Sequence, residues 1–427
     1  MWVNEKQIFA LVIFFAAYIL IVSERVHRLK AALLGFSGIL LFHLVTQEQI
    51  FSFIDFNTIG LLIGMMLLVG IVKQTGLIQY VAVKSIRASR GHPWRLLVLL
   101  TALTALISAF LDNVTTILLI GPVALSVCDT LDLDPKPFIF GEIFASNIGG
   151  TATLIGDPPN ILIGSAAGLS FNDFFLNLAP AVVIALILMY GLLYLLYGKE
   201  LVPSAKTEEI LSNFHSPRHN LDKTLTTRVL IVLAFVLAAF TVHRLLGLEA
   251  ATIALAGATA GLLICPTPVE TIIKEVDWIT ILFFSTLFML VGTLDHLGVI
   301  QLAAAKVVNL IGNHPKTLAV SLVWGSGIIS AVVDNVPYTA AVIPLVREIA
   351  SLSGIDAGPL WWALALGACF GGNGTLVGAS ANLVMAGIAE RSGIRITFAS
   401  FLKMGLMVTF VSLASSTLYI LVRYYLI

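Results

Sequence analysis

The chain has 427 residues, of which 58% are hydrophobic and only 11% are charged, whereas about 25% of the residues in an average soluble domain are charged. Its mean hydropathy of +0.99 favours a lipid bilayer as the surrounding medium, which excludes a soluble enzyme or a secreted scaffold. Lys plus Arg and Asp plus Glu number 24 each, which argues against nucleic acid as a partner. The three cysteines are scattered and identify no metal site.

Apolar segments follow one another along the chain with short polar gaps, and about 20 apolar residues suffice to cross a bilayer. The first half has segments near residues 8–22, 31–45, 57–72, 96–128, 137–168 and 177–197. The second half has segments near residues 229–246, 250–264, 278–293, 318–349, 359–388 and 402–425. Residues 199–228 carry charges and two prolines, and we interpret them as a solvated linker.

The two halves resemble each other in sequence. The motif ISAFLDNV, which starts at Ile107, returns as ISAVVDNV at Ile329, 222 positions later. At the same offset the glycine-rich motif at Gly149 returns at Gly371. Such a gapless register indicates a duplication. We therefore predict a first repeat, a cytoplasmic linker and a second repeat, over residues 1–198, 199–228 and 229–427.

Two segments are too long for one crossing and carry polar residues in the middle. Residues 96–128 contain Asp112–Asn113, and residues 318–349 contain Asp334–Asn335. Neither segment leaves room for a loop outside the membrane, so we expect two re-entrant helical hairpins whose tips lie at membrane depth.

Two further segments cannot be continuous helices. Residues 137–168 contain Gly149–Gly150 and then Asp157-Pro158-Pro159, and residues 359–388 contain the corresponding glycines. Glycine and proline interrupt a helix, so we predict two broken helices, unwound at Gly149–Thr153 and Gly371–Thr375.

These elements predict an all-α polytopic membrane protein with about ten transmembrane helices, two re-entrant hairpins and two broken helices. Five crossings in each repeat turn the second repeat over, which gives the two repeats inverted topology. Most Lys and Arg residues fall on one side, so the positive-inside rule makes that side and the linker cytoplasmic and both termini external. Counting both hairpins as full spans gives about 12 crossings without moving the linker. We expect a multi-pass protein of the plasma membrane.

Three carboxylates are predicted to lie at membrane depth, where an unpaired charge costs about 2.5–3.5 kcal/mol. Asp112 and Asp334 stand where they can cap the second arm of each hairpin, although a serine would serve that purpose at lower cost. Asp157 is the leading candidate to carry a coupling proton or cation, because Ala379 replaces it in the second repeat. Its alternative role is that of a turn residue before Pro158.

The two hairpin tips and the two helix breaks are predicted to form one site at the membrane midplane. Free carbonyls at a break bind a cation, while the start of the following half-helix favours an anion. Cys369, which replaces Asn147 in the second repeat, is a candidate contact for a thiophilic solute, with plain packing as its alternative role. The candidate substrate- or ion-binding residues are Asp112, Asn113, Thr115, Thr116, Asn147, Gly150, Thr151, Thr153, Asp157, Asn160, Asp334, Asn335, Cys369, Gly372, Asn373, Thr375 and Asn382.

The sequence contains no motif for nucleotide hydrolysis. Its Gly198–Lys199 pair is followed by Glu200 and lacks the spacing of a phosphate-binding loop. We therefore predict secondary transport driven by an ion gradient, without enzymatic activity and without a cofactor.

At these motifs the chain resembles the ion transporter superfamily. The stretch from Asp112 to Thr116, DNVTT, and the stretch from Gly141 to Asn160 resemble the branch of arsenite permeases and the melanosomal P protein. The resemblance covers nearly the whole chain, and the second stretch is specific. It implies a homodimer with a scaffold domain, made of the first three spans of each repeat, and a moving domain that carries substrate across by an elevator-like motion.

The leading hypothesis from the sequence is a proton-coupled efflux permease for arsenite or antimonite, an antiporter that confers arsenical resistance. The alternatives are a sodium-coupled symporter for citrate, dicarboxylates or another small anion, and a sodium/proton antiporter. The motifs contain no Arg or Lys that would neutralise a dicarboxylate, which counts against the symporter. A channel or receptor is disfavoured because inverted repeats with broken helices suit alternating access.

Overall fold

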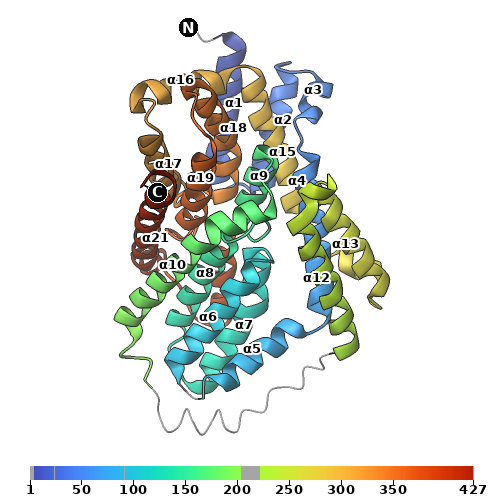
Figure 1. The fold of residues 1–427 in the computed structure, drawn as a ribbon, viewed down its shortest axis with the longest axis vertical. Helices are drawn as coiled ribbons and strands as arrows, with labels where there is room; N and C mark the ends of the chain where they lie inside the picture. Colours follow the sequence, from blue (N-terminus) through green and yellow to red (C-terminus); the bar gives the residue numbers. More distant parts are fainter. Residues whose placement is uncertain (1–3, 24, 91, 203–221, 427) are drawn as a thin grey trace.

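The computed structural model describes residues 4–23, 25–90, 92–202 and 222–426 of the chain, and these residues form helices without strands (Figure 1). Seven of the described helices are long and apolar enough to cross a membrane, and four shorter apolar helices accompany them. The expected all-α polytopic fold is confirmed. Most of the predicted linker, residues 203–221, lies outside the described residues.

Helices alternate with short connections throughout both halves. In the first half they are α1 (Glu5–Ser23), α2 (Arg28–Leu41), α3 (Gln47–Ser52), α4 (Phe56–Gln74), α5 (Leu77–Ala88), α6 (Pro93–Ser108), α7 (Asn113–Leu131), α8 (Lys136–Gly150), α9 (Pro158–Ala167) and α10 (Phe171–Tyr197). In the second half they are α12 (Lys223–Leu246), α13 (Ala250–Ile264), α14 (Val269–Ile273), α15 (Trp278–His296), α16 (Val299–Ile311), α17 (Pro315–Ser330), α18 (Asn335–Ser353), α19 (Gly358–Gly371), α20 (Ser380–Arg391), α21 (Phe398–Leu421) and the π-helical turn η1 (Val422–Leu426).

The helices of the two halves correspond one to one. Each helix from α2 to α9 begins 222 positions before its counterpart, as Phe56 of α4 does before Trp278 of α15. Figure 1 places α5 near the lower end of the molecule and its counterpart α16 near the upper end. This is the arrangement that inverted repeats produce, whereas the boundaries of the repeats at residues 198 and 229 stay a prediction.

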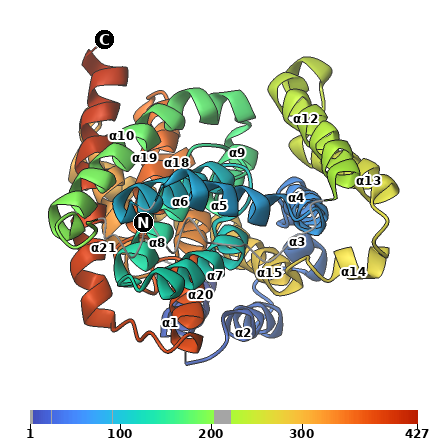
Figure 2. The ribbon, with the colours of Figure 1, turned by 90° about the horizontal axis from the view of Figure 1, so that it is seen from below.

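The first spans of each half pack across the halves. Helix α4 packs along α13, and α2 packs along α15, so corresponding contacts form twice. Gly64 permits the close approach of α4 and α13, because a Cβ there would lie 2.6 Å from the carbonyl carbon of Ala254. Figure 2 shows α12 and α13 standing beside the main bundle, next to α4.

The remaining helices form the body that contains the hairpins and the breaks. Helix α6 packs on α8, α17 packs on α19, and α10 packs on α21. Helices α6 and α7 are the arms of the first hairpin and meet at residues 109–112, while α17 and α18 meet at residues 331–334. Both Asp-Asn pairs therefore lie at the tips, where the sequence places them.

The breaks begin later than the sequence predicts. Helix α8 continues through Gly149 and Gly150, and the unwound segment comprises residues 151–157, while its counterpart comprises residues 372–379. Gly149 permits the close packing of α8 on α6, since a Cβ there would overlap the backbone of Ala105. The expectation that unwinding starts at Gly149 and Gly371 is therefore wrong. The first break starts two residues later than predicted, and the second starts one residue later.

Candidate functional site

The two hairpin tips are capped by their own aspartates. Asp112 Oδ1 accepts the backbone N–H of Thr115 at 2.9 Å, and Asp334 Oδ1 accepts that of Val336 at 3.0 Å. The hydroxyl of Thr116 donates to the carbonyl oxygen of Asp112 at 2.9 Å. These contacts satisfy amides that the start of a helix leaves free. The capping role that the sequence suggests for both aspartates is therefore present.

Asp157 does not cap the helix that follows it. It stands at the N-terminus of α9, yet its side chain makes no cap hydrogen bond. Its carboxylate instead accepts the side-chain amide of Asn335 at 3.2 Å and lies 3.5 Å from that of Asn113. Asn113 and Asn335 start the second arms of the two hairpins, so both tips reach this one buried carboxylate. A turn-forming role alone does not account for that position.

An amide network joins the two breaks. Asn147 donates to the side-chain oxygens of Asn373 and Asn382, both at 2.9 Å, and accepts from Asn113 at 3.1 Å. The counterpart of its bond to Asn382 is the bond from the Cys369 thiol to the side-chain oxygen of Asn160, at 3.7 Å. All six side chains are buried. The same contact thus occurs twice, with an amide in one half and a thiol in the other.

Several predicted site residues fix the unwound backbone. Asn160 donates to the carbonyl oxygens of Thr151 and Thr153, and Asn382 donates to those of Gly372 and Thr375, at 2.7–3.0 Å. These bonds occupy carbonyls that the sequence analysis assigns to a cation.

Further contacts tie each break to its neighbouring hairpin. The hydroxyl of Thr153 donates to the carbonyl oxygen of Ala109, and that of Thr375 donates to the carbonyl oxygen of Ala331 at 2.6 Å. A Cβ on Gly150 would lie 2.8 Å from the carbonyl oxygen of Gly156. These residues support the site and do not line its cavity.

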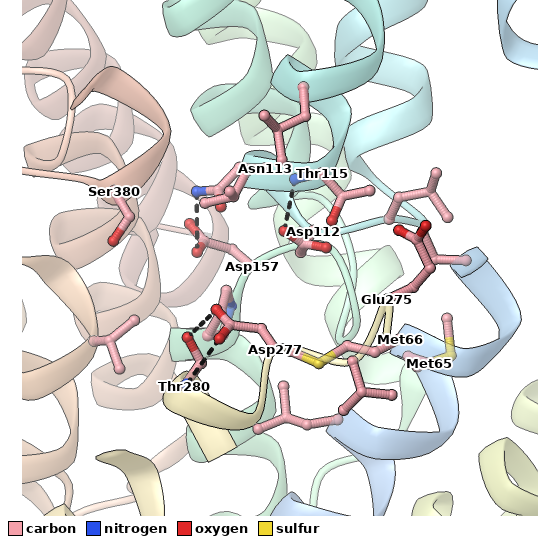
Figure 3. A pocket seen from close by; sticks show the side chains of 18 of the residues that line it. Met65, Met66, Asp112, Asn113, Thr115, Asp157, Glu275, Asp277, Thr280 and Ser380 are labelled. Atoms are coloured by element: carbon pink, nitrogen blue, oxygen red, sulfur yellow. Dashed lines mark hydrogen bonds between the residues drawn. The ribbon is translucent and has the colours of Figure 1, made fainter. Parts of the chain in front are cut away.

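A cavity of about 650 Å³ opens beside the tips. Five of the predicted residues line it, namely Asp112, Asn113, Thr115, Asp157 and Asn335. Figure 3 shows Asp112, Thr115 and Asp157 on one side of the cavity, with Met65 and Met66 of α4 and Asp277 and Thr280 at the start of α15 across from them. The cavity therefore lies between the hairpins and the spans that pack across the halves.

Arg28, which the sequence analysis does not select, also lines the cavity. Its guanidinium donates to the hydroxyls of Ser380 at 2.9 Å and Thr280 at 3.1 Å and lies 3.6 Å from the carboxylate of Asp334. It also lies 5.4 Å from the ring centre of Phe283, as in a cation–π contact. Asp334 also accepts the hydroxyl of Ser380 at 2.8 Å and is not itself among the lining residues.

Other charges at the cavity are of both signs. Lys73 pairs with Glu275 at 2.7 Å, and Lys274 and Asp277 line the same space. Among the described residues, no group of three His, Cys, Asp or Glu side chains is arranged to hold a metal ion. The cavity therefore combines amides and hydroxyls with basic and acidic side chains.

Comparison with known proteins agrees with a transporter. The profile of the family described as "Citrate transporter" (CitMHS) matches residues 18–367 and 298–426. An uncharacterized transporter of Mycobacterium tuberculosis is 42% identical over 427 residues, with 99% of both chains covered. The human P protein is 33% identical over 506 residues, which cover 99% of this chain and 60% of the P protein.

Two solved structures share the fold. The Alcanivorax borkumensis YdaH transporter matches with a TM-score of 0.63 at 17% identity, with 98% of both chains covered. Neisseria gonorrhoeae MtrF, described with a class of antimetabolite efflux pumps, matches with a TM-score of 0.62 at 13% identity, over 98% of this chain and 95% of the other. The resemblance to the ion transporter superfamily is confirmed, and the chain is a membrane transporter that belongs to the citrate transporter family.

Proposed function

We propose that this protein is a secondary active transporter that carries a small carboxylate anion together with a proton. The observation that carries the proposal is the position of Arg28 at the cavity. A guanidinium binds a carboxylate through two parallel hydrogen bonds, which a lysine cannot do. Arg28 removes the objection that the motifs lack a basic residue, so the carboxylate replaces arsenite as the first hypothesis.

Arg28 also suggests how binding and movement are linked. It contacts Thr280 on α15 and both Ser380 and Asp334 at the starts of α20 and α18. A substrate carboxylate that takes the place of Asp334 keeps the charge of Arg28 balanced and accepts the Ser380 hydroxyl, which donates to Asp334 at 2.8 Å, while the Thr280 hydroxyl stays bonded to Asp277. The exchange loosens a contact between the bodies that the superfamily resemblance assigns to the scaffold and to the moving domain. This supports an elevator-like motion that begins when substrate binds.

Asp157 is proposed as the group that binds the coupling proton. Amide groups from both hairpin tips converge on its ionised carboxylate, and no basic residue pairs with it among the described residues. Protonation neutralises the charge and weakens its hold on Asn113 and Asn335. The packing between the two tips then depends on protonation, which is the requirement for coupling. Sodium in place of the proton is the second candidate.

Arsenite or antimonite remains an alternative cargo. These solutes bind thiols, and Cys369 is the cysteine of the predicted site. It is fully buried and its thiol is engaged with Asn160, away from the lining of the cavity. This position favours a structural role for the thiol, so we rank the arsenical second.

Transport assays with the purified full chain in proteoliposomes test the proposal. Radiolabelled citrate, succinate and arsenite are offered under an imposed pH gradient or an imposed sodium gradient. We expect carboxylate accumulation under the pH gradient. Arg28→Gln is expected to lower it at least tenfold, since a hydrogen bond to a charged group contributes about 1.5–3 kcal/mol.

The control is Arg25→Gln, because Arg25 is an exposed arginine three positions earlier. It is expected to transport at the wild-type rate. Arsenite transport that is insensitive to Arg28→Gln, with no carboxylate uptake by the wild type, contradicts the carboxylate proposal. If a sodium gradient drives carboxylate accumulation and a pH gradient does not, sodium is the coupling ion.

We also propose that the protein is a homodimer of the plasma membrane with a cytoplasmic linker. The distribution of basic residues and the superfamily resemblance support these points. Cysteines introduced for Asn4 and Ser212 are expected to react with an impermeant reagent from outside and from inside, respectively. Labelling of Ser212→Cys from outside intact cells contradicts the topology, and a monomeric mass in light scattering contradicts the dimer.

A further inference from the structure

A second buried carboxyl group lies outside the cavity. Glu142 is in the middle of α8 and its exposed fraction is 0%. The hydroxyl of Thr104 on α6 donates to its Oε2, while its Oε1 has no hydrogen-bond partner among the described residues. Because Glu142 does not line the cavity, substrate binding does not explain it.

Among the residues that the structure describes, none supplies a counter-charge to Glu142. The titratable groups that face it are the Tyr190 phenol of α10 and the Cys128 thiol of α7. The charged residues of the other described parts of α6, α7, α8, α20 and α21 are exposed, namely Arg95, Asp129, Lys136, Glu390, Arg391 and Lys403. An ionised carboxylate at this place costs several kcal/mol, so the neutral acid is the resting form.

The second half of the molecule shows that packing does not require this acid. Leu364 occupies the corresponding position, 222 residues later, and is equally buried in α19. The helix pairs are otherwise alike, since Ser108 donates to the carbonyl of Ser146 at 2.7 Å and Ser330 donates to that of Ala368 at 2.6 Å. A leucine thus fills the same space between the same helices, and the acid of the first half needs another reason.

A polar side chain follows Glu142 on α8 toward the tip of the first hairpin. Ser146 lies one turn further along α8, and its hydroxyl donates to the carbonyl oxygen of Asn113 at 3.0 Å. Asn113 in turn lies against Asp157. In the second half, Ala368 replaces Ser146, so this connection is present only in the half that has the acid.

Further polar side chains lie on the other side of Glu142, away from the cavity. Thr101 lies one turn before Thr104 on α6, and its hydroxyl is 3.4 Å from that of Tyr190. Val323 replaces Thr101 in the second half. Tyr190, Thr101, Thr104, Glu142 and Ser146 therefore form a polar stripe through an apolar body, with Glu142 as its one acid.

We propose that Glu142 is a second proton-binding site, which takes a proton from the side where α6 begins and passes it to Asp157. The carboxylate of Glu142 takes the proton from a hydronium ion, which leaves water, and becomes the neutral acid. On transfer, Glu142 becomes the carboxylate again and Asp157 becomes the acid, so charge and protons balance without another reactant. This inference rests on the proposed proton coupling at Asp157 and extends it with a relay.

Infrared difference spectroscopy tests the site without any substrate. The carbonyl stretch of a protonated carboxyl group is followed while the pH is raised, in the Asp157→Asn variant so that Asp157 does not contribute. We expect a band that disappears at high pH, that shifts in Thr104→Val, and that is absent when Glu142→Gln is added. Glu390→Gln, which changes an exposed acid, is the control and is expected to keep the band. A spectrum that Glu142→Gln leaves unchanged overturns the proposal.

Transport tests the relay. Glu142→Leu introduces the residue of the second repeat and is expected to preserve folding. It should retain exchange of substrate across the membrane and lose most accumulation driven by a pH gradient. Accumulation at the wild-type rate with the wild-type pH dependence overturns the relay, even if the infrared band is lost. If the wild type moves no carboxylate at all, the proposed substrate is wrong, while the infrared measurement still decides whether Glu142 binds a proton.

Discussion

The two helix breaks share a set of hydrogen bonds but differ in other side chains. One break lies between α8 and α9, and the other lies between α19 and α20. In both, an asparagine at the start of the second half-helix, Asn160 or Asn382, holds two carbonyls of the unwound segment. In both, a threonine, Thr153 or Thr375, ties the break to its hairpin. These shared contacts explain why the two breaks keep one geometry after their sequences diverged.

The differences concern charge and hydrogen-bonding capacity. The first break has Asp157 where the second has Ala379, and the first has Asn147 where the second has Cys369. The extra acid, Glu142, belongs to the same half, whereas the second break contributes Ser380, which binds Arg28. The comparison suggests that the two halves have different functions. The first half binds the coupling proton, and the second half takes part in anion binding.

The strongest test of this division is the removal of the acid that one half lacks. Asp157→Asn mimics the protonated form and keeps a similar shape, so substrate exchange should persist while accumulation against a gradient is lost. Asp157→Glu should retain part of it. Uptake into proteoliposomes with and without a pH gradient measures both. Wild-type accumulation with an unchanged pH dependence in Asp157→Asn would falsify the assignment and transfer the role to Asp112 or Asp334.

The contacts that both breaks share predict that corresponding substitutions in the two halves lower the stability of the protein by similar amounts. A Cβ on Gly149 would overlap the backbone of Ala105, and one on Gly371 would overlap that of Gly327. Gly149→Ala and Gly371→Ala should each destabilise the protein by about 1–3 kcal/mol or more, because backbone cannot yield as a flexible side chain does. Thermal unfolding in detergent measures the loss.

The matched control for these glycines is Gly387→Ala, since a Cβ on Gly387 has no neighbour within 4 Å. This variant should unfold at or above the wild-type temperature, because alanine favours a helix interior. If Gly149→Ala or Gly371→Ala unfolds at the wild-type temperature, the two breaks are not supported in the same way.

The amide of Asn147 has no counterpart in the second half, where Cys369 replaces it. Its removal is expected to lower stability less than the glycine substitutions do. Asn147→Ala leaves the side-chain oxygens of Asn373 and Asn382 without the amide that bonds both. A buried acceptor that loses its partner costs about 1–3 kcal/mol. We expect a lower unfolding temperature, and Asn147→Asp should not restore it, because a carboxylate cannot donate. Full stability of Asn147→Ala would show that water replaces the amide.

Much of the fold could be predicted from the sequence, because the decisive features are local. Asp-Asn in the middle of a long apolar segment has few explanations besides a buried tip, and the hairpin arms indeed meet at residues 109–112 and 331–334. Proline after Asp157 fixes where the second half-helix begins. The first end of the break was misplaced, because Gly149 and Gly150 serve packing against α6, a contact that the local sequence does not reveal.

The site was predicted less completely than the fold. Arg28 stands beside a predicted span and is not among the candidate residues, while its partners Thr280 and Ser380 lie 252 and 352 positions further along the chain. Only the folded chain brings them together. Asn160, Asn382, Thr153 and Thr375 are predicted from the sequence to bind substrate or an ion. In the structure their side chains bond to backbone carbonyls, a role that residue types alone do not distinguish from ligand binding.

The smallest effect is expected at Cys369, the counterpart of Asn147. Its thiol makes a weak hydrogen bond to Asn160, at 3.7 Å, and also interacts with Asp157 and Thr151, whereas the amide of Asn147 makes two hydrogen bonds at 2.9 Å. Cys369→Ala should therefore cost about 1 kcal/mol or less, the value of one modest hydrogen bond. Carboxylate transport should stay at the wild-type rate, since the thiol does not line the cavity. Arsenite uptake measured in the same vesicles completes the comparison. If arsenite is transported and Cys369→Ala abolishes it while Cys128→Ala does not, the thiol binds cargo, and the second half contributes a ligand that the first half lacks.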